Sequence, residues 1–145
     1  MGWRVHYYSY QNRNDLRLGA GFQGTAMDSQ LLNDARGLQA RTVAMRREIH
    51  RHPELGLDLP RTRETVLDAL SGLDLEVSCS EATSGVVATL RGSRPGPTVL
   101  LRGDMDALPM PEDTDLPFAS EESGRMHACG HDAHTAMLAS AAHLL

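Results

Sequence analysis

The sequence has few cysteines and no long apolar run, and each shortage excludes a class of protein. Cys79 and Cys129 are the only cysteines among 145 residues, too few and too far apart for a disulfide scaffold. No window approaches the roughly 18 uninterrupted apolar residues of a membrane-spanning helix. We therefore expect a cytoplasmic protein with no membrane partner, in which Cys129 is reduced and not bonded to Cys79.

Positive charge is also in short supply. The chain has 14 basic and 19 acidic residues, which gives a formal net charge of −5. Nucleic-acid-binding proteins normally carry a basic patch or stripe, so no nucleic-acid partner is expected. The apolar content of 41% and the charged content of 23% are typical of a soluble globular protein.

Aromatic residues are scarce and unevenly placed, because Phe118 is the only one after Met27. Residues 1–26 show no helical or alternating period, and they lack the apolar segment of a secretory signal. We interpret residues 1–26 as an atypical N-terminal extension and residues 27–145 as the domain proper, with Met27 as a candidate true start. A flexible natural arm is an equally good interpretation of the same composition.

Two amphipathic helices are predicted in the first half of the domain. Apolar residues recur at steps of three and four up to Ile49, and Pro53 should end this helix because the residue before a proline avoids the helical region. A second helix is expected after Pro60, with Gly72 closing it. The predicted inward positions are Ala35, Leu38, Thr42, Met45 and Ile49 in the first helix and Val66, Leu67 and Leu70 in the second.

Three short segments with strand-like composition follow, at residues 73–80, 85–92 and 98–104. In the third, "TVLL" (98–101) is apolar on both faces, which predicts a central strand covered by helices above and below. Residues 107–125 should form a long acidic loop that contains several prolines.

A last helix is expected from Ala133, with the carboxylate of Asp132 capping its free N–H groups. Helices, strands and then a helix give an α/β fold class without internal repeats. The predicted apolar stripe of the last helix is Ala133, Ala136, Met137, Ser140, Ala141 and Leu144.

The motif "RGDMDALP" places Asp104 and Asp106 directly after the third predicted strand. In open α/β sheets the carboxyl ends of strands are where ligands bind. Two such carboxylates can act on one ligand, or one of them can orient a neighbouring histidine. An Asx-turn at the end of the strand is the structural alternative.

The motif "MHACGHDAH" (126–134) concentrates three histidines, a cysteine and an aspartate in nine positions. Cys129 and His131 are two residues apart, and thiolate and imidazole are good ligands for metals such as zinc. Three alternatives stay open: a buried thiol among histidines satisfied in a turn, a nucleophilic Cys129 activated by a distant histidine, and a closed structural zinc site. The last needs four ligands in paired spacings, and only one such pair is present.

Four segments together resemble a known family: "EIHRHPELGLDLPRT", "SGVVATLRG", "TVLLRGDMDALPMPE" and "FASEESGRMHACGHDAHTAMLASAAHLL". They are similar to the metal-dependent amidohydrolases that include hippurate hydrolase, N-acyl-amino-acid amidohydrolase and indole-acetyl-amino-acid hydrolase, within the aminoacylase and carboxypeptidase group. The resemblance covers about residues 30 to 145. It implies the N-terminal part of a mixed-sheet, helix-covered, metallo-exopeptidase-like catalytic domain, with the remainder and a lid domain absent.

The resemblance also implies roles for individual residues. Cys129 and His131 correspond to metal ligands of the family, and Asp106 to the acidic residue that supports the chemistry of the metal site. Asp104 stands where related peptidases carry a ligating histidine, which leaves its role less defined. The family's general-base glutamate and its other histidine ligands have no counterpart in this sequence.

The function implied by the resemblance is hydrolysis of the amide bond of N-acyl amino acids. Two divalent ions, manganese or zinc, would polarise the carbonyl and activate a water molecule, and a carboxylate would move the proton. The partner would be a small N-acyl amino acid, and the complete enzyme is expected to form a homodimer. The alternative is a catalytically inactive fragment or a non-enzymatic metal-binding module that keeps part of the fold.

Overall fold

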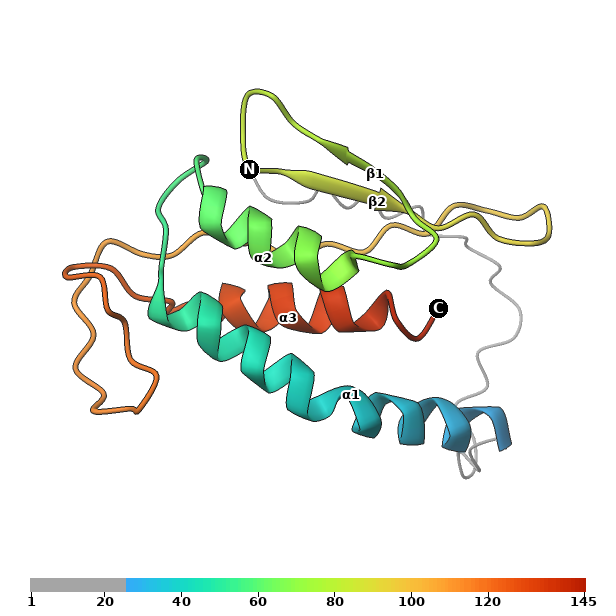
Figure 1. Cartoon of the computed structure of the whole chain (residues 1–145), viewed down its shortest axis with the longest axis horizontal. Helices are drawn as coiled ribbons and strands as arrows, with labels where there is room; N and C mark the ends of the chain where they lie inside the picture. The colour runs from blue at the N-terminus through green and yellow to red at the C-terminus, as the bar shows by residue number, and fades with distance from the viewer. Residues whose placement is uncertain (1–25) are drawn as a thin grey trace, which may run out of the picture.

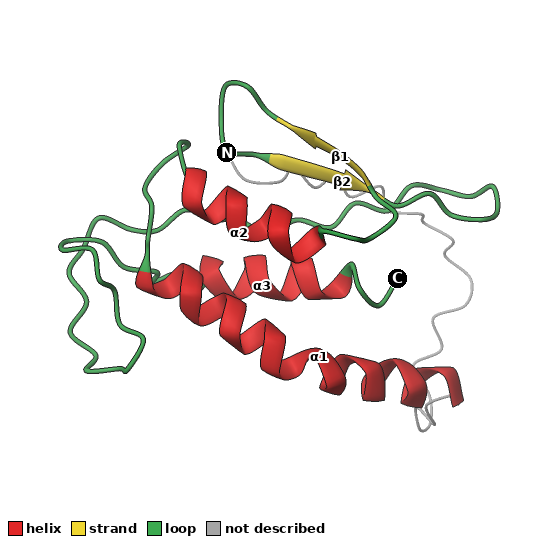
Figure 2. Cartoon of the chain, in the orientation of Figure 1, coloured by secondary structure: helices red, strands yellow, loops and turns green. Residues whose placement is uncertain are grey.

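The computed structural model describes residues 26–145, so the predicted extension falls almost entirely outside the described residues and stays a prediction. Helices and a small antiparallel sheet make up the described chain, which confirms the α/β class (Figures 1 and 2). In chain order the elements are α1 (Ala26–Arg51), α2 (Pro60–Leu70), β1 (Glu76–Cys79), β2 (Val86–Thr89) and α3 (His131–Ala141).

The long helix α1 follows its predicted pattern. The side chains of the apolar stripe turn inward, and Ile49 near its end is 2% exposed. The helix ends at Arg51, two residues before Pro53, as expected from the restriction that a proline imposes on its predecessor. No helix within residues 26–145 combines the length and the apolar character needed to cross a membrane.

The start of α2 is stabilised by a side chain from the preceding turn. Leu59 at the N-cap offers no side-chain acceptor, and Pro60 occupies the first helical position, where its missing N–H costs nothing. Glu54 takes the place of a cap: its Oε2 accepts hydrogen bonds from the backbone N and the Oγ1 of Thr62, both at 2.8 Å. At the other end Gly72 has a φ of 80°, which confirms it as the closing glycine.

The hairpin of β1 and β2 pairs Glu76 with Thr89 and Cys79 with Val86. Strand β1 is exposed along its whole length, whereas Val86 on β2 is fully buried. The hairpin therefore reaches the core through β2 alone.

The largest apolar cluster lies under α2 and β2. It includes Met105, between the two aspartates of the "DMD" motif, so this motif is anchored by its central side chain. Val66 and Leu70 are buried, and Leu67 packs against them, which confirms the predicted inward face of α2. The buried members are Leu59, Val66, Leu70, Val86 and Met105.

The prediction of a central strand over residues 98–104 is wrong for this chain. The segment is not part of any ladder within the described residues, and Val99 and Leu101 are 79% and 49% exposed. An apolar pattern on both faces needs neighbouring strands to pair with and two covering layers. Residues 26–145 offer this segment neither, because the sheet they form consists of β1 and β2 only.

Helix α3 begins two residues earlier than predicted, and its buried face shares Ala136 with the predicted stripe. Asp132 lies inside the first turn and makes no cap, and Met137, predicted to face inward, is 55% exposed. The helix lies between α1 and α2, where mostly small side chains allow close packing (Figure 1). Its buried residues are Asp132, Thr135, Ala136 and Ala139, at the spacing of one helical face.

Gly103 is the point where the segment before the "DMD" motif meets α3. A Cβ there would lie 3.1 Å from the carbonyl oxygen of His134. We predict that Gly103→Ala lowers the free energy of unfolding by about 1–3 kcal/mol, because one backbone must move away from the other. Urea unfolding of the chain measures this difference.

The matched control is Gly37→Ala in α1, where an added Cβ meets nothing within 4 Å. This change should raise the free energy of unfolding by about 0.5–1 kcal/mol, because alanine is the better helix former. Equal stability of Gly103→Ala and the unsubstituted chain would contradict the close approach.

Candidate metal centre at the start of α3

Backbone pairing brings the two polar motifs together. Leu108 N donates to Met126 O at 2.9 Å, and Met126 N donates to Leu108 O at 3.0 Å. This antiparallel bridge closes the loop 107–125, which leaves and returns at the same place. The bridge therefore sets "MHACGHDAH" beside "DMDALP".

The predicted pair Asp106 and His131 is in direct contact. The Nδ1 of His131 lies 2.8 Å from the carbonyl oxygen of Asp106 and 3.0 Å from its Oδ1. Both partners are acceptors, so Nδ1 donates in these contacts, and in the tautomer with a single proton the lone pair of Nε2 is the one that can bind an ion. Metal-ligating histidines are typically held in this way, with one ring nitrogen donating to a carboxylate or carbonyl.

Cys129 lies in the turn just before α3. Gly130 follows with a φ of 84°, a conformation that glycine adopts without strain, and the helix begins at His131. Cys129 and Cys79 are both free and exposed, which confirms that the two are not bonded to each other.

The donors that fit a metal ion are thus the exposed thiol of Cys129 and the Nε2 of His131. Within residues 26–145 no group of three or more histidine, cysteine, aspartate or glutamate side chains is arranged to hold an ion. Stable sites generally draw at least three ligands from the protein. The roles of Cys129 and His131 as ligands stay a prediction.

Asp104, the other aspartate of "DMD", has different partners. Its carboxylate pairs with Arg102, and its carbonyl oxygen accepts a hydrogen bond from Thr135 Oγ1 at 2.8 Å. Of the two carboxylates, that of Asp106 is therefore the one bonded to His131.

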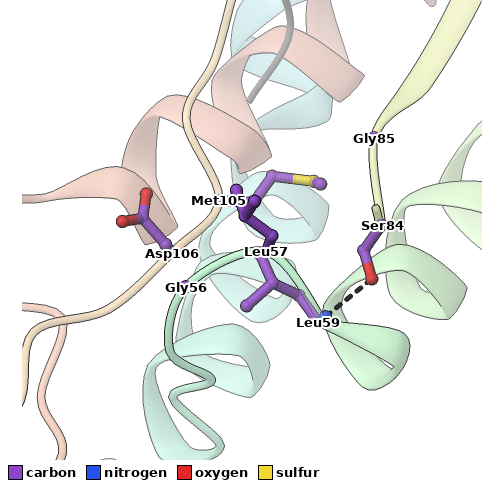
Figure 3. A pocket seen from close by; sticks show the side chains of 7 residues that line it. All are labelled: Gly56, Leu57, Leu59, Ser84, Gly85, Met105 and Asp106. Atoms are coloured by element: carbon purple, nitrogen blue, oxygen red, sulfur yellow. Dashed lines mark hydrogen bonds between the residues drawn. The ribbon is translucent and has the colours of Figure 1, made fainter. Parts of the chain in front are cut away.

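A small cavity lies next to Asp106. Its volume of about 10 Å³ has room for a single water molecule and excludes an acyl amino acid. In Figure 3 Asp106 lies on one side of it, and on the other Ser84 Oγ accepts a 2.6 Å hydrogen bond from Leu59 N. The lining residues are Gly56, Leu57, Leu59, Ser84, Gly85, Met105 and Asp106.

Behind the site, the carboxylate of Asp132 is completely buried and held from α1. Its Oδ2 accepts hydrogen bonds from Arg46 Nε at 2.9 Å and from His50 Nδ1 at 2.8 Å. Burial raises the pKa of Asp132, but the hydrogen bonds from His50 and Arg46 outweigh burial and bring that pKa below its usual value. Asp132 is therefore ionised at neutral pH.

The acidic loop contributes a second buried carboxylate. Glu112 Oε2 accepts from Ser120 N at 2.7 Å, and its Oε1 lies 3.2 Å from His50 Nε2. Burial raises the pKa of Glu112, but hydrogen bonds from Thr114, Ser120 and His50 bring that pKa below its usual value. Glu112 is ionised as well.

The sequence interpretation did not identify His50 or Glu112. His50 directly follows Ile49 at the end of the apolar stripe of α1, so a buried polar side chain beside this stripe was the available signal. Its partner Asp132 is 82 residues away, and no local pattern links two such positions.

His127 is buried to 4% exposure, and neither of its ring nitrogens has a hydrogen-bond partner within residues 26–145. Burial lowers the pKa of the His127 imidazole to about 4, so the ring is neutral at neutral pH. Its nitrogens are not accessible to an ion, unlike the thiol of Cys129.

Residues 100–145 match the model of Peptidase family M20/M25/M40. The chain is 47% identical over 117 residues to thermostable carboxypeptidase 1 of Saccharolobus solfataricus. This match covers 80% of this chain and 30% of that protein. It is 48% identical over 97 residues to the N-acyl-L-amino acid amidohydrolase of Geobacillus stearothermophilus, covering 66% of this chain and 26% of that protein.

Solved structures agree with the sequence matches. A protein from methicillin-resistant Staphylococcus aureus superposes with a TM-score of 0.76 at 39% identity, over 80% of this chain and 30% of that one. A Bacillus subtilis dinuclear metal binding peptidase from the M20 family gives a TM-score of 0.67 at 39% identity, over 72% of this chain and 29% of that one. The chain thus spans about 30% of the length of these relatives. These matches confirm the resemblance to metal-dependent amidohydrolases, and the family model that matches, over residues 100–145, is that of Peptidase family M20/M25/M40.

Proposed function

We propose that this chain is part of a hydrolase that cleaves the amide bond of N-acyl amino acids at a site with divalent metal ions. The observation that carries the proposal is the hydrogen bonding of His131 Nδ1 to Asp106, which leaves Nε2 available two residues after the exposed thiol of Cys129. Relatives named N-acyl-L-amino acid amidohydrolase and N-acetylcysteine deacetylase support the substrate class.

In this proposal Cys129 and His131 bind one of the ions. Asp106 holds the imidazole ring in the tautomer that presents Nε2, and its negative charge makes that nitrogen a stronger ligand. A bound divalent ion supplies polarisation of the scissile carbonyl and a lowered pKa of a water molecule. Asp106 thus acts through His131 and keeps it oriented.

The chemistry of the donors leaves manganese and zinc as candidates. Thiolate favours zinc, whereas carboxylates in the remainder of a site would suit manganese. A two-ion site is supported by the M20 relative described as dinuclear metal binding. Further ligands and the proton acceptor would come from outside residues 26–145, because the described residues supply no group of three.

The same observation favours a second candidate, a metal-binding module that does not catalyse hydrolysis. The two candidates predict different results in one assay, which measures the release of an amino acid from N-acetyl amino acids in the presence of manganese or zinc. Amidohydrolase activity should appear in the longest product of the reading frame and disappear with a chelator. If that product binds metal stoichiometrically and hydrolyses nothing, the second candidate replaces the first.

The 145-residue chain alone should bind metal weakly and release no amino acid in the same assay. Two protein ligands leave an ion mostly hydrated, and no proton acceptor is provided. Chelator-sensitive hydrolysis by the purified chain would contradict this expectation and would mean that a second copy or a partner completes the site.

Cys129→Ala and His131→Ala should each remove most of the bound metal and most of the turnover in the longest product. The loss should exceed the roughly 10–100-fold that is typical when a ligand's outer partner is removed. The matched control is Cys79→Ala, since Cys79 is also free and exposed but lies on β1. Metal content after dialysis and the rate of amide hydrolysis provide the readout, and an unchanged metal content in Cys129→Ala would refute its assignment.

Asp106→Ala should weaken metal binding by about 10–100-fold, because His131 loses a partner that fixes its ring. Asp106→Asn keeps an oxygen acceptor for Nδ1 and should lose less. Asp104→Ala is the control, because Asp104 pairs with Arg102 and does not contact His131. Isothermal titration with zinc compares the three, and equal losses for Asp104→Ala and Asp106→Ala would contradict the role of Asp106.

A further inference from the structure

His50 links two buried carboxylates that come from distant parts of the chain. Its Nδ1 lies 2.8 Å from Asp132 Oδ2, and its Nε2 lies 3.2 Å from Glu112 Oε1. The side chains of His50, Asp132 and Glu112 are 4%, 0% and 2% exposed. Solvent therefore does not replace these contacts.

Each ring nitrogen of His50 faces one oxygen of a carboxylate. Each of these carboxylates is also held by a second partner, since Asp132 accepts from Arg46 and Glu112 accepts from Ser120. His50 therefore hydrogen-bonds to two carboxylates at once, one at each ring nitrogen.

The groups around His50 come from three parts of the chain. Asp132 comes from α3 and is paired with Arg46 of α1, and Glu112 comes from the acidic loop. The ring of Phe118 lies edge-on at 5.4 Å between centroids, and the neutral ring of His127 lies at 6.2 Å. Two carboxylates and two rings thus surround the imidazole of His50.

The link joins three segments that surround the candidate metal centre. Asp132 directly follows His131 in the first turn of α3, so fixing Asp132 fixes the backbone that carries His131. Glu112 fixes the loop whose closing bridge sits just before Cys129. If His50 formed a hydrogen bond through only one ring nitrogen, it would hold either the start of α3 or the acidic loop, but not both.

We propose that His50 is a positioning residue for the metal centre, which holds the turn of Cys129 and the start of α3 in place through simultaneous hydrogen bonds to Asp132 and Glu112. This proposal rests on the metal-binding roles of Cys129 and His131. It assigns to α1 a part in the geometry of the site, although α1 contributes no ligand.

The test adds cobalt(II) as the metal probe to the longest product of the reading frame, because a thiolate–cobalt absorption band reports ligation by Cys129. His50→Gln should weaken cobalt binding about tenfold or more and reduce the band at saturation, since a glutamine cannot reach both carboxylates with donors. The matched control is Thr42→Val. Thr42 Oγ1 lies 2.6 Å from Ser140 Oγ, so this variant also removes a hydrogen bond between α1 and α3, but far from the turn.

A purely structural role would lower the melting temperature in both variants and leave cobalt binding unchanged at a temperature where both are folded. That result would overturn the proposal for His50 and leave the metal site intact. Absence of a Cys129-dependent band in the unsubstituted protein would overturn the metal-binding roles themselves, and the proposal with them. The two failures are therefore distinguishable.

A second measurement observes His50 directly in the unsubstituted protein. Nitrogen-15 NMR of the histidine side chains should show a hydrogen bond at both ring nitrogens of His50. In Glu112→Gln the signal of Nε2 should shift, while that of Nδ1, which faces Asp132, should change little. A ring nitrogen of His50 without a hydrogen bond in the unsubstituted protein would overturn the double link.

Discussion

The arrangement of the molecule depends on the burial of one carboxylate, that of Asp132 at the start of α3. An ionised carboxylate without partners in a protein interior is costly, so its position is possible only where hydrogen-bond donors reach it. Helix α1 provides them, through Arg46 and His50. Because Asp132 is adjacent to His131, the same contacts that neutralise a buried charge also fix a candidate metal ligand, and the packing of α3 on α1 and the geometry of the site cannot vary independently.

A second constraint acts through the acidic loop, which would otherwise be a long unsupported connection. Glu112 bonds to the far side of His50, and Phe118 lies under the guanidinium of Arg47 at 4.9 Å. The candidate site is thus supported from behind by buried charges and is open in front, where the thiol of Cys129 is exposed. Rigid support with an accessible donor is what a metal centre needs to keep its geometry.

The exposed apolar segment before the "DMD" motif shows how this chain relates to its longer relatives. The side chains of Val99 and Leu101 are exposed to solvent, although the apolar pattern of this segment is typical of a strand that is covered on both faces. Contiguous apolar exposure is typical of surfaces that contact other protein. This fits a chain that spans about 30% of the length of the relatives that it matches.

The sequence by itself determined the elements whose signals are local: the apolar stripe of α1, the limits of α2 between Pro60 and Gly72, and the two hairpin strands. It also carried the resemblance to the amidohydrolases, through four segments taken together. Only the tertiary structure decided which face of α3 is buried, that Asp132 is not a cap, and that His50 bridges two carboxylates. These features depend on polar groups that meet across as many as 86 residues, and such contacts leave no periodic trace in the sequence because they form only when α1, α3 and the loop pack together.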